Sequence, residues 1–437
     1  MDKFSLKAIC GLLAVALVAA GVGSVCAQTS TTAQLQGEIK NLKIQLDVKQ
    51  QRIEMLEREL NRLRAQPAGA RERKMIDEIT LEVSRIRGLR AKAPIQFATL
   101  TPEVLNRLLD EEIKGKHETE FQGYTILLKH LGLIPRDMEL EKSLRALLSE
   151  QIAGAYDDKT KKLYISDKFD LNSSVARIIL AHEICHSLQD QHFNLTSSPL
   201  HMENNDDRAM AVLTIVEGDA MLLLAEYARE KVSWKTLLEL PRLLMMDQSQ
   251  LASAPPFVYR SLLFPYITGQ TFVMQNVYEG PSAMRNRIFR EMPRSTEQIL
   301  HSEKYFGPDH DEPTEIALDE LTSGGLIPAE HIFNNVAGEF GIQCVLSEHL
   351  SASDASSAAA GWDGDRVVFG GRLDGAYALA WLSVWDSEED AREFADALKR
   401  YLMAQRPGLS QKSSKTSPGG DITLADSRGV IRIARKG

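Results

Sequence analysis

The sequence predicts a mainly α-helical protein with small sheets, which is an α+β fold. Helical periodicity dominates from about residue 70 to about residue 323, strand-like runs are few and short, and the last hundred residues mix both patterns. With 437 residues, of which 43% are hydrophobic, the chain is long enough for one large core or two moderate ones. The expected order is a signal peptide at 1–27, a coiled coil at 28–66, a helical domain at 67–328 and a C-terminal α+β domain at 329–437.

The helical domain is expected to contain several long helices and one hairpin. Thr101 and Pro102 have the pattern of an N-cap followed by the first helical residue. Pro265 is expected to interrupt a later helix. The other expected helices lie at 175–191 and 205–228, and two short strands at 152–156 and 162–166 are joined by a turn-rich connection.

The C-terminal domain is expected to alternate helices and strands. Its helices are predicted at 337–350 and 388–401, and its strands at 366–369, 376–384, 422–425 and 430–433.

The first 27 residues have the pattern of an export signal. Two lysines precede an apolar stretch at 9–20, and Val25-Cys26-Ala27 offers small residues for cleavage. Cleavage would give a periplasmic or secreted protein that begins at residue 28. The alternative is an uncleaved anchor in the inner membrane, because residues 8–27 form a charge-free run of about the 20 residues that span a bilayer.

Residues 28–66 predict a coiled coil that could join copies of the chain into a homo-oligomer. Apolar residues alternate spacings of four and three, as a heptad seam requires, and Lys49 is the exception. The alternative is a single amphipathic helix packed on the body of the protein. The seam positions are Leu35, Ile39, Leu42, Leu46, Lys49, Ile53, Leu56, Leu60 and Leu63.

Composition argues against two classes of protein. The net charge of −9 and the pI near 5.7 argue against a nucleic-acid partner, which would require clustered Lys and Arg. Signal cleavage would leave only Cys185 and Cys344, which are too few for a disulfide-stapled scaffold.

The segment His182-Glu183-Ile184-Cys185-His186 has the HExxH pattern. Two histidines four residues apart project from one face of a helix, so both imidazoles can bind one Zn²⁺. The intervening Glu183 would lie beside a metal-bound water and accept its proton during attack on a peptide carbonyl. We therefore expect His182 and His186 to be metal ligands and Glu183 to be the catalytic base.

A catalytic zinc usually has three protein ligands, so a third is expected. Glu217 is one candidate, because an unpaired carboxylate inside an apolar helix would be costly unless it bound a cation. His192 is the other, because His182, His186 and His192 have the metzincin spacing. Position 189, where metzincins have a Gly that permits a sharp turn, is Gln189, and this favours Glu217.

The arrangement of HExxH on one helix and a Glu-Gly pair on the next resembles the gluzincin metallopeptidases related to thermolysin. More closely, the chain resembles an uncharacterised group of exported bacterial HExxH proteins, over most of residues 150–305. The segments that carry this resemblance are 181–193, 216–220, 154–157, 263–266 and 293–300.

The resemblance implies a zinc metallopeptidase-like domain at 67–328, with His182, His186 and Glu217 as ligands and Glu183 as base. Thermolysin-like enzymes carry an Asp four residues after the ligand Glu to orient a zinc-binding His, and here that residue is Met221. The group that orients such a His is therefore not identified from the sequence.

These observations predict an exported zinc metallopeptidase acting on a peptide or protein substrate. The run 163–166 is expected to receive the substrate backbone by strand addition. Tyr266, His301 and Tyr305 are candidates for stabilising the oxyanion. The alternative is a non-catalytic cell-envelope interaction protein that uses the coiled coil to bind partners and carries a structural zinc site.

Overall fold

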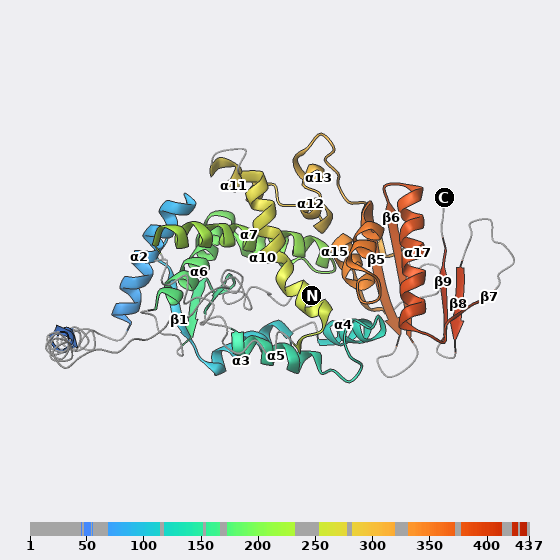
Figure 1. Ribbon diagram of the computed structural model, residues 1–437, viewed down its shortest axis with the longest axis horizontal. Helices are drawn as coiled ribbons and strands as arrows, with labels where there is room; N and C mark the ends of the chain where they lie inside the picture. The colour runs from blue at the N-terminus through green and yellow to red at the C-terminus, as the bar shows by residue number, and fades with distance from the viewer. Residues whose placement is uncertain are drawn as a thin grey trace, which may run out of the picture.

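The computed structural model describes residues 45, 48–53, 55, 69–113, 118–151, 154–166, 173–231, 253–277, 282–319, 331–371, 377–412, 422–426 and 429–434 (Figure 1). The signal peptide predicted at 1–27 and almost all of the coiled coil predicted at 28–66 lie outside these residues. Both therefore stay predictions.

Helices make up most of the described residues and the sheets are small, which confirms the α+β prediction. None of the described helices is both long and apolar enough to cross a membrane. The helices before residue 320 are α2 (Ala70–Arg87), α3 (Pro102–Ile113), α4 (Glu118–His130), α5 (Leu140–Gln151), α6 (Ser174–Phe193), α7 (Asp206–Lys231), α10 (Pro256–Val277), α11 (Ser282–Arg290), α12 (Thr296–Leu300) and α13 (Glu303–Phe306).

Helices α6 and α7 form the centre of this region, and most of their residues are buried. Helix α6 begins where Ser173 accepts a hydrogen bond from the Ala176 amide, and it ends at Asn194, whose φ of 52° is left-handed. Helix α2 packs against both, and α10 crosses α7 (Figure 1). The prediction that Pro265 interrupts a helix is wrong, because α10 continues through it.

Helices α7 and α10 touch through two glycines. A Cβ on Gly218 would lie 2.3 Å from the carbonyl carbon of Gly269, and a Cβ on Gly269 would lie 2.1 Å from the carbonyl oxygen of Thr214. Any larger residue would force the backbones apart. The crossing therefore fixes α10 beside Glu217, the residue before Gly218.

Replacing Gly269 by Ala is expected to lower the free energy of unfolding by about 1–3 kcal/mol, the usual cost of overpacking. Urea denaturation followed by circular dichroism measures the change. Gly408→Ala is the matched control, since nothing lies within 4 Å of a Cβ built there, and it should change stability by less than about 0.5 kcal/mol. Equal stability of the two variants would contradict the close crossing.

A three-stranded sheet lies beside α6, in the order β1 (Gln96–Leu100), β3 (Lys162–Ser166), β2 (Gly154–Asp157). Strand β1 pairs with β3 in parallel, and β2 pairs with β3 antiparallel. The expectation that the run 163–166 receives a substrate backbone by strand addition is therefore wrong, because β3 is the central strand and is paired on both sides. Among the described strands, the edge next to α6 is β2.

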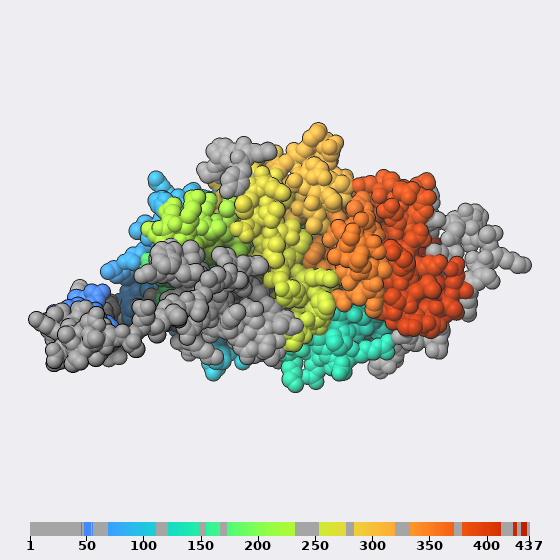
Figure 2. Space-filling model, in the orientation of Figure 1, coloured from blue at the N-terminus to red at the C-terminus, as the bar shows by residue number. Residues whose placement is uncertain are grey.

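The C-terminal part contains two further three-stranded sheets, in the orders β4-β5-β6 and β7-β8-β9. It forms one end of the elongated molecule, where it adjoins α10 and α4 (Figure 2). Its elements are β4 (His331–Asn335), α15 (Gly338–Leu346), α16 (Ala352–Ala359), β5 (Trp362–Gly371), β6 (Tyr377–Trp385), α17 (Glu388–Gln405), β7 (Ser410–Lys412), β8 (Ile422–Asp426) and β9 (Gly429–Ile433).

Candidate metal centre

Three side chains meet between α6 and α7. The Nε2 atoms of His182 and His186 are 3.1 Å apart, and each lies 3.2 Å from Oε2 of Glu217. None of the three residues is more than 1% exposed. The structure therefore brings together the three residues that the sequence suggests as metal ligands.

The geometry of this group fits a tetrahedral cation. Ligand atoms at 2.0–2.1 Å from a tetrahedral metal lie about 3.3 Å from one another, close to the separations seen. Both oxygens of Glu217 are buried and accept no hydrogen bond of good geometry from the residues described. A buried carboxylate in this state needs positive charge nearby.

The neighbouring imidazoles favour the ionised form of Glu217. Burial by itself raises the pKa of the carboxyl group, but the imidazoles of His186 and His182 outweigh burial and lower the pKa to about 2. The group thus offers one negative oxygen and two imidazole nitrogens, a donor set that suits Zn²⁺.

Glu183 lies on α6 beside these residues and is 1% exposed. Its Oε2 accepts a hydrogen bond of 2.8 Å from the backbone amide of Tyr156, which belongs to β2. The edge strand therefore holds the carboxylate next to the group of His182, His186 and Glu217.

His186 has a hydrogen-bonded partner that the sequence does not reveal. Its Nδ1 lies 2.9 Å from Oε1 of Gln189, and the amide nitrogen of Gln189 donates to Oδ2 of Asp219 at 2.7 Å. From the sequence, Gln189 is notable only as the residue that replaces the metzincin glycine. The one available signal is its i, i+3 spacing from His186.

His192 lies apart from the group. Its Nε2 is 2.7 Å from the backbone carbonyl oxygen of Arg90, near the C-terminal end of α6. The structure does not bring it to His182 and His186.

The three candidates for oxyanion stabilisation differ in what they contact. His301 lies 3.1 Å from Glu339, and Tyr305 donates to the backbone carbonyl of Glu291. Tyr266 is 2% exposed, and its hydroxyl has no hydrogen-bond partner within the described part of the chain. It lies one turn before Gly269, where α10 crosses α7 next to Glu217.

The two cysteines of the body are both buried and form no disulfide. Burial raises the pKa of the Cys185 thiol well above its usual value and that of Cys344 to about 12. Neither joins the group of His182, His186 and Glu217.

A second acidic group, Glu297, Asp311 and Asp386, also has carboxylates close together. The ammonium group of Lys304 lies among them, at 2.6 Å from Glu297, 3.0 Å from Asp311 and 2.6 Å from Asp386. The positive charge of Lys304 compensates the negative charge of these carboxylates. Its ion pair with Asp386 connects α13 to the C-terminal part.

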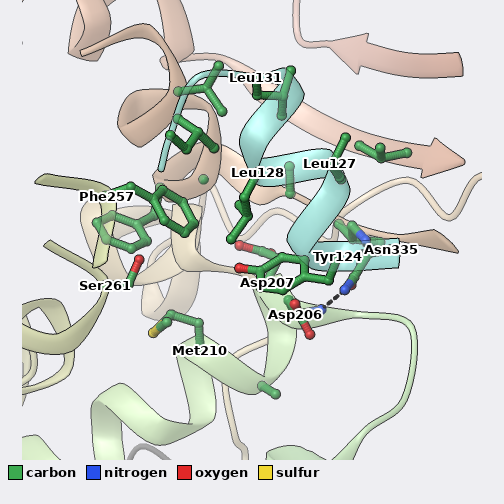
Figure 3. A pocket seen from close by; sticks show the side chains of 18 of the residues that line it. Tyr124, Leu127, Leu128, Leu131, Asp206, Asp207, Met210, Phe257, Ser261 and Asn335 are labelled. Atoms are coloured by element: carbon green, nitrogen blue, oxygen red, sulfur yellow. Dashed lines mark hydrogen bonds between the residues drawn. The ribbon is translucent and has the colours of Figure 1, made fainter. Parts of the chain in front are cut away.

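An apolar cavity of about 250 Å³ lies at the junction between α4, α7, α10 and the C-terminal part (Figure 3). Leu127, Leu128 and Met210 belong to its wall, with Asp206 and Asp207 at one side. None of the metal-ligand candidates lines it, so the cavity is separate from the metal centre.

Comparison with protein families gives one match. A family model described as a domain of unknown function (DUF8575) matches residues 328–437, which contain the C-terminal sheets. Neither the curated proteins nor the solved structures gave a match to the chain.

Proposed function

We propose that this protein is an exported zinc-dependent metallopeptidase. The observation that carries the proposal is the convergence of His182, His186 and Glu217 at 3.1–3.2 Å in a buried site, with Glu183 beside them. Structural zinc sites are normally closed by four protein ligands. Within the described residues the group holds three, which supports catalysis over a structural brace.

In the proposed hydrolysis, the cation would activate the water molecule and Glu183 would transfer its proton. A zinc ion bound by these residues would polarise a water molecule and lower its pKa to about 7. Glu183 accepts the proton of the attacking water and passes it to the leaving amine, while Tyr266 is the candidate donor to the developing oxyanion. The hydrogen bond from Tyr156 keeps the Glu183 carboxylate oriented for this transfer.

A peptide substrate would have β2 as the described strand edge beside Glu183. The Tyr156 amide is directed toward Glu183 and away from β3, so the backbone of Gly154, two residues earlier, faces the same side. An extended peptide could add to this edge beside Glu183. This assignment replaces the run 163–166, which β1 and β2 flank.

Metal analysis combined with digestion of a broad peptide library tests the proposal. We expect about one zinc ion per chain, and cleavage that a chelator abolishes and added zinc restores. Purified protein that contains no zinc, or cleavage that persists after the metal is removed, would contradict the proposal. A metal coordinated by four protein groups without catalysis would instead support the envelope protein with a structural zinc site.

Export predicts that the mature chain begins at Gln28, because signal peptidase cuts after small residues such as Ala27. N-terminal sequencing of protein from the host envelope measures this. A chain that starts at Met1 and fractionates with membranes would mean that residues 8–27 anchor the protein.

A further inference from the structure

The side chain of Gln189 connects His186 to a buried ionic group. Its Oε1 lies 2.9 Å from Nδ1 of His186, and its Nε2 lies 3.0 Å from the carbonyl oxygen of Val216 and 2.7 Å from Oδ2 of Asp219. Gln189 is 0% exposed, so no solvent competes for these hydrogen bonds.

The partners of Gln189 determine which way its amide points. A backbone carbonyl oxygen and an ionised carboxylate can only accept hydrogen bonds, so the NH₂ group must face Val216 and Asp219. Its oxygen must then face His186, and an oxygen requires a donor. The proton of the neutral His186 ring is therefore on Nδ1, and Nε2 carries the lone pair that faces Glu217.

Asp219 is in turn held by two arginines. Its Oδ2 accepts from Nε of Arg87 at 2.8 Å, and its Oδ1 accepts from Nε of Arg285 at 2.5 Å. Arg87 belongs to α2 and Arg285 to α11, and both are buried. A guanidinium group can only donate, so both oxygens of Asp219 act as acceptors, and the Gln189 amide that reaches Oδ2 must be a donor too.

We propose that Gln189 is a positioning residue that fixes the tautomer and the orientation of His186, and that Asp219, held by Arg87 and Arg285, fixes Gln189. The assignment of the tautomer stands on the hydrogen bonds alone. The consequence for metal affinity rests on the proposed function, in which His186 binds zinc.

The two histidines differ in this respect. The Nδ1 atom of His182 is buried and has no hydrogen-bond partner in the part of the chain that the structure describes. Among the described residues, His186 thus has a side-chain partner at Nδ1, whereas His182 has no counterpart to Gln189 at that atom.

The first test observes the tautomer directly in the metal-free full-length chain. Long-range ¹H–¹⁵N spectra of ¹⁵N-histidine-labelled protein distinguish Nδ1–H from Nε2–H, and the His186→Gln variant assigns the signal. At a pH where the imidazole is neutral, we expect His186 as the Nδ1–H tautomer alone. An Nε2–H tautomer, or a mixture of the two tautomers in the wild-type protein, overturns the proposal.

The second test measures zinc affinity by competition with a chelator. We expect Gln189→Leu to weaken zinc binding by about 10- to 100-fold, the usual effect of removing a group that orients a ligand. Gln191→Leu is the matched control, because in the described part of the chain the side chain of Gln191 is hydrogen-bonded to the backbone of Lys92 and Ala93 and to the Ser187 hydroxyl, and to none of the residues of the site. Its affinity should equal that of the wild type, and equal affinities of the two variants overturn the proposal.

A double-mutant cycle tests the link to Asp219. Asp219→Asn is nearly isosteric and should weaken zinc binding in the wild-type background, but it should add little once Gln189 is Leu. Fully additive losses would show that Asp219 does not act through Gln189. A wild-type chain that binds no zinc would refute the proposed function and leave the tautomer result unaffected, so the two failures are distinguishable.

Discussion

Glu183→Gln is expected to retain the zinc content of the wild type and to lower the rate of peptide hydrolysis by a factor of about 10²–10⁴, the usual contribution of a general base. The amide has nearly the same shape as the carboxylate but cannot accept the proton of the attacking water. Hydrolysis of a cleaved library peptide and zinc content by atomic spectroscopy measure the two quantities on the same sample.

Glu203→Gln provides the matched control for this prediction. Glu203 is an exposed carboxylate, and the same substitution there should change neither quantity. A Glu183→Gln variant that hydrolyses peptides as fast as the wild type would show that Glu183 is not the base.

Glu217→Ala is expected to lose zinc and, with it, stability. The substitution removes one of the three proposed protein ligands and the negative charge of the site. A ligand that binds only the folded state at 100 times its Kd stabilises that state by about 2.7 kcal/mol, and this term disappears with the metal. Zinc content and urea denaturation with and without added zinc measure both effects.

His192→Ala is the comparison for Glu217→Ala. Its imidazole contacts the carbonyl oxygen of Arg90, so its loss should leave the zinc content unchanged. If His192→Ala empties the site while Glu217→Ala keeps one zinc per chain, the third ligand has been assigned to the wrong residue.

The three residues that converge in the candidate metal centre could be found from the sequence because their signals are local. His182 and His186 are one helical turn apart, and Glu217 is an acidic residue within an apolar helix. Secondary structure was predictable for the same reason. Helix α7 and strands β5, β6, β8 and β9 all contain or overlap the predicted ranges.

The features that could not be predicted depend on contacts between distant segments. Strand β1 pairs with β3 from more than sixty positions earlier, as in the partners Gln96 and Lys162, and this pairing turns a supposed edge into the centre of the sheet. Arg87 and Arg285 reach Asp219 from α2 and α11, and neither position has a local pattern that indicates it. Pro265 stays helical because packing of α10 on α7 overrides the loss of one hydrogen bond.

The hydrogen bond from the Tyr156 amide to Glu183 makes β2 a common support for two parts of the proposed reaction. A peptide added to β2 would be aligned by the same backbone that holds the base, so a shift of the strand would move both together and preserve their separation. A poorly docked peptide would lack this common alignment with the carboxylate. Differences between substrates would then appear in kcat as well as in KM. Peptides that fit the strand poorly would be cleaved slowly even at saturating concentration.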